Sequence, residues 1–215
     1  MEELQVQWWG LTDYAEALSR QQELFLARQQ RKISDTLVVT EHRPVITLGS
    51  GTTQEDILVS EEEIALNGIK LCRIGRGGRV TYHGPGQLII YPIIHLEQCR
   101  KDLHRYRWLL EEVCISVLKQ LNLQGARRQG YPGIWVGAAK IASLGIQVRK
   151  WVTMHGLALN VTHHLEGFSF INPCGIKGCD ITSLEYQLGY PPELELVAKQ
   201  AVQQFSLHFK YSKLN

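Results

Sequence analysis

Short runs rich in Val, Ile and aromatic residues, set among helical segments, constrain the fold of this chain more than any other feature. Each run is bounded by Gly or Pro, as strands commonly are. The runs cover residues 36–40, 45–48, 70–74, 87–94, 134–136, 140–148 and 153–161. Because they do not alternate with helices in a strict βαβα order, we expect an α/β (α+β) fold in which helices flank a mixed β-sheet.

Helices are expected at residues 13–31, 60–68, 102–121 and 194–209. Thr12 is the expected N-cap of the first helix, because a threonine hydroxyl satisfies a free backbone N–H there. Ser60 followed by Glu63 has the form of a capping box. The last helix begins just after Pro191 and Pro192, and proline is favoured at helix starts.

Size and composition favour one globular domain. The chain has 215 residues, of which 44% are hydrophobic, and it contains no internal repeat, low-complexity tract or linker. This length is enough for one sizeable core. We therefore expect residues 1–215 to form a single domain.

Charge and apolar patterning exclude several classes of protein. Lys plus Arg total 23 against 21 for Asp plus Glu, a net charge of +2 that does not favour nucleic-acid binding. The start MEELQVQWWG has no basic region before an apolar one, so it does not resemble a secretion signal. The apolar stretch at 88–96 is too short to span a bilayer. Five cysteines, an odd number, favour reduced thiols, so we expect a soluble, cytoplasmic protein without membrane contact.

A glycine-rich segment at residues 75–87 is the first candidate for chemistry, with five glycines, two arginines and a histidine. Glycines let the backbone approach a ligand closely. A hairpin loop whose glycines only meet turn geometry is an equally good interpretation. The segment is not a dinucleotide fingerprint, because Val80 stands where the third glycine belongs, and no Gly-Lys-Ser/Thr follows to make a P-loop.

Cys174 and Lys140 are the other two candidates. Cys174 lies between Pro173 and Gly175, and a thiol in such a turn is better presented to a substrate than one inside a helix. Lys140 is set among small and apolar residues, where an ammonium loses its proton more easily. A lysine that snorkels from a strand end is the commoner case. Cys72 and Cys114, in a predicted strand and helix, are better explained as small buried hydrophobes.

Metal and serine chemistry are not favoured. His163, His164, Cys174 and Cys179 lie within seventeen residues, yet their order and spacing do not fit the usual zinc sites, and His-Glu-x-x-His is absent. We expect no metal. A Gly-x-Ser-x-Gly nucleophile elbow is also missing, which leaves thiol chemistry as the main catalytic option.

Four segments belong together: RGGRVTYHGPGQLIIYP, AKIASLGIQ, HGLALNV and FINPCGI. In order and spacing they resemble the lipoyl(octanoyl) transferase family of lipoate biosynthesis. The resemblance runs from about residue 36 to 185. It implies the biotin/lipoate protein ligase-like catalytic fold and a single catalytic acyltransferase domain. It also implies transfer of an octanoyl group from octanoyl-acyl carrier protein to the lysine of a lipoyl domain, the first step of endogenous protein lipoylation.

The same resemblance assigns the site. It makes Cys174 the nucleophile that carries the acyl group as a thioester, and Lys140 the partner that favours its thiolate and relays protons. The acyl-substrate pocket is expected to include Arg76, Gly77, Gly78, Arg79, Val80, Thr81, Tyr82, His83, Ser143, Leu144, Gly145, Gly156, Leu157 and Ala158. His83 is either a second base or a residue that positions the turn or the substrate. The oxyanion donors stay open between the glycine-rich turn and the backbone around Cys174.

Partners and cofactors follow from this activity. The donor is octanoyl-acyl carrier protein, and the acceptors are lipoyl-domain proteins such as dehydrogenase E2 subunits and the glycine cleavage H protein. No cofactor and no ATP are expected, because the acyl group arrives activated, and we expect a monomer. Basic residues at 100–107 form either a docking patch for the acidic carrier or a solvated helix face.

Two rival functions remain. An ATP-dependent lipoate or biotin protein ligase shares the fold but proceeds through an acyl-adenylate and needs no cysteine. The turn at Cys174 therefore favours the transferase. A non-catalytic acyl-binding module is the other rival, but it would have no need for both Cys174 and Lys140.

Overall fold

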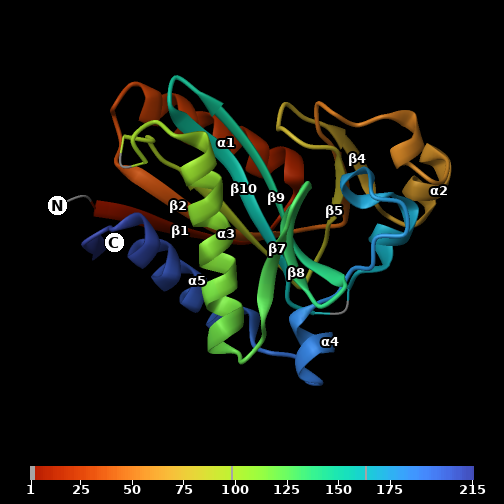
Figure 1. Ribbon diagram of the computed structural model, residues 1–215. Helices are drawn as coiled ribbons and strands as arrows, with labels where there is room; N and C mark the ends of the chain where they lie inside the picture. Colours follow the sequence, from red (N-terminus) through yellow and green to blue (C-terminus); the bar gives the residue numbers. More distant parts are fainter. Residues whose placement is uncertain (1–2, 98, 163) are drawn as a thin grey trace.

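A computed structural model describes residues 3–97, 99–162 and 164–215. Its main feature is a mixed eight-stranded sheet (Figure 1). The strand order is β11 (Lys213–Leu214), β1 (Glu3–Thr12), β2 (Asp35–His42), β6 (Gln87–Ile93), β10 (Val152–Asn160), β9 (Ala139–Arg149), β8 (Tyr131–Val136) and β7 (Gly125–Arg128). Strand β1 runs parallel to β11 and β2, and the other neighbours are antiparallel.

A smaller three-stranded sheet lies to the right in Figure 1. Its central strand β3 (Val45–Leu48) is parallel to β4 (Lys70–Arg73) and antiparallel to β5 (Val80–His83). Helix α2 (Glu61–Leu66) and the short 3₁₀ helices η1 (Gln54–Asp56), η2 (Glu166–Phe170) and η3 (Pro173–Gly175) belong to this side of the molecule. A separate apolar cluster around Ile46, Val80 and Phe168 holds this part together.

Helices cover both faces of the large sheet. Helix α1 (Tyr14–Gln29) packs on β10, β6 and β2. Helices α3 (Leu103–Gln120) and α5 (Leu194–Phe209) pack on each other and cover the opposite face, where they bury the largest apolar cluster. Helix α4 (Leu184–Leu188) lies between β10 and α5 in the chain. The mixed sheet flanked by helices that the sequence predicts is confirmed.

Most predicted elements are present, and the differences have physical causes. Residues 75–87 are not one loop, because β5 crosses them as a fully buried strand. Strand β1 was not predicted, since its register shifts between Trp8 and Gly10, which has a positive φ, and this bulge breaks the alternating pattern. The short strand β7 and helix α4 were also not predicted. The N-cap of α1 is Asp13 instead of Thr12, because the Asp13 carboxylate accepts from the N–H of Ala15.

Within the described ranges of the chain, every helix is too short or too polar to cross a membrane.

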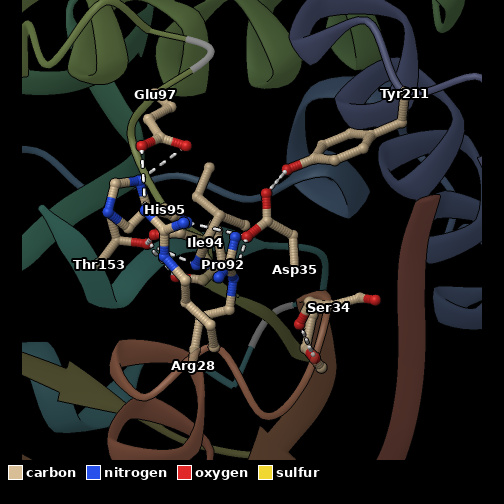
Figure 2. A network of polar contacts seen from close by, with 11 residues as sticks. Arg28, Ser34, Asp35, Pro92, Ile94, His95, Glu97, Thr153 and Tyr211 are labelled. Carbon is tan, nitrogen blue, oxygen red and sulfur yellow. Dashed lines mark hydrogen bonds and ion pairs between the residues drawn. The ribbon is translucent and has the colours of Figure 1, made fainter. Parts of the chain in front are cut away.

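A buried carboxylate joins four parts of the chain (Figure 2). Asp35, at the start of β2, accepts from Arg28 Nε at 2.6 Å, from the His95 N–H at 2.8 Å and from the Tyr211 hydroxyl at 2.7 Å. Asp35 is only 6% exposed, so these bonds replace the water that it loses. The contacts tie the end of α1, the end of β6 and the segment after α5 to one point.

We expect Asp35→Asn to lower the free energy of unfolding by about 3 kcal/mol, because removing one partner of a buried ion pair leaves the other uncompensated. Urea denaturation followed by circular dichroism measures this loss. Glu97→Gln is the matched control: its carboxylate contacts the same region but is largely exposed, so the change should cost less than about 1 kcal/mol. Equal effects of the two substitutions would contradict the central role of Asp35.

Candidate active site

A lysine and a cysteine that are 34 positions apart in the chain meet where β9 begins. Lys140 Nζ donates to Cys174 Sγ at 2.8 Å. The lysine is 1% exposed, and no carboxylate of the described residues lies within ion-pair distance of its Nζ. Its N–H donates to the Asp180 carbonyl at 2.7 Å, and its carbonyl accepts from Thr182. The chain after Cys174 therefore returns to hold the lysine backbone in place.

Cys174 is presented by a strained turn. It lies in η3 with φ 57° and ψ 18°, the left-handed region that non-glycine residues rarely adopt. The preceding Asn172 fixes the turn, because its N–H donates to the Asp56 carbonyl at 2.8 Å and its amide donates to the Glu55 carbonyl at 2.9 Å. Such strain persists only where surrounding contacts impose it, and it is concentrated at functional sites.

Arg79 supports the same turn from the side. It forms an ion pair with buried Asp56 at 2.8 Å, and its guanidinium also donates to Thr53. A Cβ on Gly175 would lie 2.3 Å from Arg79 Nη1, so only glycine allows the arginine to pack directly behind Cys174. Arg79 thus lines the cavity and also anchors η3 to η1.

The lysine side chain passes over Gly133 in β8. A Cβ there would lie 2.5 Å from Lys140 Cε and 2.4 Å from the Ala142 carbonyl oxygen. Gly133 also has φ +121°, which L-residues avoid. The lysine can therefore reach Cys174 only because position 133 has no side chain.

The sequence resemblance implies acyl transfer, and we expect Gly133→Ala to lower its rate at saturating substrate by about 10- to 100-fold, because a displacement of about 1 Å in a reacting group has effects of this size. Single-turnover transfer assays measure it. Gly130→Ala is the control: Gly130 lies in the same hairpin with a positive φ, but open space surrounds its Cβ position. If both variants lose activity equally, backbone strain and not the lysine position is responsible.

A cavity of about 210 Å³ opens beside this pair. All of the predicted pocket residues line it except Gly77 and Tyr82. The Gly77 N–H bonds to the Ile146 carbonyl, and Tyr82 packs on Phe168 in the small-sheet core. The lining also includes residues that the sequence did not indicate as pocket residues: Tyr14, Ile89, Tyr91, Pro132 and His155.

Buried aromatic and histidine rings cluster around part of this cavity. Tyr14 stacks on His83 with ring centroids 6.1 Å apart, and His42 lies 5.1 Å from Tyr14 and 5.8 Å from Tyr91. Tyr91 also lies 6.4 Å from His155. Burial lowers the pKa of His42 to about 4 and of His83 to about 3, where the neighbouring His42 contributes as well. Burial likewise lowers the pKa of His155 to about 4, so all three rings are neutral at pH 7.

These neutral histidines make folding sensitive to acid. Each has a folded pKa below the usual value of about 6.5, so the unfolded chain binds more protons and stability falls as pH drops from about 6.5 toward 3. We expect a loss of up to about 4 kcal/mol per pH unit for the three together. Urea titrations between pH 7 and 5 measure it. His42→Gln should reduce the slope, whereas His104→Gln, at an exposed position, should leave it unchanged.

The other four cysteines are poorly suited to act as nucleophiles. Burial raises the pKa of Cys99 to about 11 and that of Cys114 to about 12. It also raises the pKa of Cys72 and of Cys179. All five thiols are free.

The structure bears on two further hypotheses from the sequence, a metal site and a docking patch for the carrier protein. In the part of the chain that the structure describes, no group of three or more His, Cys, Asp or Glu is arranged to hold a metal, and His163 of that hypothesis lies outside the described residues. The basic residues at 100–107 lie at the start of α3, at the left of Figure 1, whereas the segment with η3 lies at the right. Arg107 pairs there with Glu111. Carrier docking at this patch stays a prediction.

Comparison with known proteins shows similarity to a family model, to a curated relative and to solved structures. The family model of the lipoyl protein ligase A/B catalytic domain matches residues 13–206. An octanoyltransferase of Desulforamulus reducens is 42% identical over 203 residues, which is 94% of this chain and 89% of that protein. A structure of a bipartite lipoate protein ligase and its E2 lipoyl domain from Thermoplasma acidophilum matches with a TM-score of 0.73 at 15% identity, covering 100% of this chain and 85% of that one. A biotin protein ligase from Aquifex aeolicus, in complex with biotin and ATP, matches with a TM-score of 0.57 at 13% identity, covering 97% and 70%. These two structures confirm the expected biotin/lipoate protein ligase-like fold.

Proposed function

Because the chain belongs to the octanoyltransferases, within the lipoyl protein ligase A/B catalytic family, and is therefore an acyltransferase, we propose that it transfers octanoyl groups through a thioester on Cys174. The donor in this proposal is octanoyl-acyl carrier protein, and the acceptor is the lysine of a lipoyl domain. The contact of 2.8 Å between the buried Lys140 Nζ and Cys174 Sγ carries the proposal. A nucleophilic thiol beside a basic group, at the mouth of a mostly apolar cavity, is what thioester exchange requires.

The first half-reaction forms the acyl-enzyme. Lys140 takes the thiol proton of Cys174, and the thiolate attacks the thioester carbon of the donor. The bond from that carbon to the carrier sulfur breaks, and the carrier leaves as a thiol after it accepts the proton from Lys140. One thioester replaces another, so the step needs no ATP.

The second half-reaction forms the amide. The acceptor amine attacks the Cys174 thioester, its proton passes to Lys140, and Lys140 returns a proton to the departing Cys174 sulfur. Buried Lys140 serves both halves, because no carboxylate of the described residues competes for its protons. The free enzyme is regenerated.

Backbone N–H groups of Cys174 and of the glycine-rich turn supply the oxyanion donors in this proposal. In this turn, the Gly77 N–H donates to the Ile146 carbonyl. The N–H groups of Gly78 and Arg79 have no backbone acceptor among the described residues. Around the nucleophile, the N–H groups of Gly175 and Ile176 already bond to carbonyls within the turn. The N–H of Cys174 itself also has no backbone acceptor among the described residues, so the proposal places the oxyanion between this N–H and those of the glycine-rich turn.

His83 fits a positioning role better than that of a second base. Its Nδ1 lies 2.7 Å from Gln87 Oε1, and Gln87 in turn donates to Asn160 at 2.8 Å. Burial keeps its pKa near 3, so the ring is neutral and a weak base at pH 7. The remaining pocket residues, which are Arg76, Gly78 to Thr81, Ser143 to Gly145 and Gly156 to Ala158, form the walls of the acyl site in this proposal.

The proposal also covers the acceptor proteins, the domain organisation, the oligomeric state and the compartment. Lipoyl domains of dehydrogenase E2 subunits and the glycine cleavage H protein are the proposed acceptors. We treat residues 1–215 as one catalytic domain, because the family model spans residues 13–206, and we propose that it works as a monomer. Five free thiols support a reducing compartment, so we place the enzyme in the cytoplasm.

Intact-protein mass spectrometry tests the proposal. After mixing with octanoyl-acyl carrier protein without ATP, the chain should gain the mass of one octanoyl group, labile to hydroxylamine, and lose it when a lipoyl domain is added. Transfer without any covalent adduct would overturn the thioester route. Transfer only after ATP and magnesium are added would instead support an acyl-adenylate mechanism.

A further inference from the structure

The cavity extends along β9 and β10, away from the reacting pair. The residues of β9 that line it, Ser143 to Gly145, span about 7 Å of strand. His155 on β10 pairs with Ile146, so its backbone lies at the far end of this span. The residues between, from Ser143 to Gly145 and from Gly156 to Ala158, line the cavity.

An octanoyl chain is long enough to run past these residues. With C–C bonds of about 1.5 Å, eight carbons in extended form span about 9 Å. This inference rests on the proposed function in one respect, that the acyl chain enters the cavity from Cys174. Its distal end then points toward the inner side chains, which occupy the space beyond it.

Those inner side chains are polar, although an alkyl chain needs only apolar walls. Tyr14 and His155 each line the cavity at 3% exposure, and His83 does so at 7%. Buried polar groups in proteins nearly always have hydrogen-bond partners. Among the described residues, however, neither the Tyr14 hydroxyl nor the His155 imidazole has one.

Arg76 and His83 also line the cavity, and they add an unused donor and an unused acceptor. Arg76 is buried and uses Nη1 and Nη2 on the Gly77 and Thr47 oxygens, while its Nε has no acceptor in the described ranges and lies along Gly145. His83 uses Nδ1 on Gln87 and leaves Nε2 free of any described partner. Four side chains that line the cavity thus carry unused hydrogen-bonding atoms.

We propose that the inner end of the cavity is a hydrogen-bonding subsite for a hydroxyl group at the distal end of a medium-chain acyl group. Tyr14 and His155 are its central members, since both are buried, line the cavity and lack a described partner. The subsite allows the enzyme to accept hydroxylated eight-carbon acyl chains beside the unsubstituted one. It also disfavours longer apolar chains, whose extra carbons would have to cover these polar atoms.

Calorimetric binding of two free acids, octanoate and 8-hydroxyoctanoate, tests the subsite without requiring turnover. The native chain should bind the two acids with affinities within about threefold of each other. Tyr14→Phe should weaken 8-hydroxyoctanoate by about three- to tenfold relative to octanoate, the usual effect of one lost hydrogen bond. His155→Asn, which tolerates the positive φ of 60° at this position, should act in the same direction.

Tyr106→Phe is the matched control, because it removes another buried and unpaired tyrosine hydroxyl that lies outside the cavity, and it should leave the ratio of affinities unchanged. A native chain that binds 8-hydroxyoctanoate tenfold or more weakly than octanoate would overturn the subsite, as expected for an apolar end wall. An equal effect of Tyr14→Phe on both acids would also overturn it. Octanoyl transfer, assayed in parallel on the same preparation, tests the proposed function separately.

Discussion

Cys174→Ala is expected to lose octanoyl transfer by at least about a thousandfold, because the acyl group has no sulfur on which to rest between donor and acceptor. The variant should also gain no mass when it is mixed with octanoyl-acyl carrier protein. It should fold normally, since Cys174 is only half-buried and alanine has no bulk to accommodate. Thermal unfolding of the variant and the native chain checks this point.

Cys179→Ser is the matched control for the nucleophile. It lies five positions further along the same segment, is also half-buried, and has a pKa raised by burial. We expect it to keep full transfer activity and to acquire one octanoyl group as the native chain does. If Cys179→Ser lost the adduct and Cys174→Ala kept it, the acyl-enzyme would have to be assigned to Cys179.

How far the sequence predicts this fold depends on how local each signal is. Helix α5 falls at the expected residues 194–209, because a proline pair and a long amphipathic pattern define it locally. Strands β9 and β10 are predicted within one residue at each end. The sequence does not indicate strand β5, because its four residues lie within a glycine-rich segment and their burial depends on β3 and η3, which are distant in the chain.

The candidate site likewise combines residues that local sequence indicates with a contact that depends on distant parts of the chain. Cys174 and Lys140 are indicated by their neighbours in the chain and by resemblance to a family, but nothing local says that they meet. Their contact arises because the segment after Cys174 pairs with β9 at Lys140, a long-range feature. Gly133 could not be identified from the sequence, since its importance lies in the space that Lys140 occupies.

The inner histidines and tyrosines show a further limit of prediction from the sequence. Tyr14 reads as an ordinary residue at the start of an amphipathic helix, and His155 as one polar residue in an apolar strand. Only the packing of α1 on β6 and β10 brings them to one cavity. The positive φ of His155 inside a strand is visible only in three dimensions.

Lys140→Met is expected to lower octanoyl transfer by about 100- to 10,000-fold, the range that a general acid–base group contributes. Methionine has a similar length and no charge, so it fits a position that is 1% exposed and passes over Gly133 without a clash. Folding should therefore survive, and the loss should fall on the chemistry.

Two readouts separate the roles of this lysine. Alkylation of Cys174 by iodoacetamide at pH 7 reports on the thiolate alone, and it should slow by about tenfold or more in Lys140→Met if the ammonium favours the thiolate. Aminolysis of a preformed octanoyl-enzyme by a lipoyl domain reports on the second half-reaction, and it should slow as well if Lys140 accepts the amine proton. Slower alkylation with unchanged aminolysis would restrict Lys140 to activating the thiol. Unchanged rates in both assays would show that the 2.8 Å contact with Cys174 has no catalytic role.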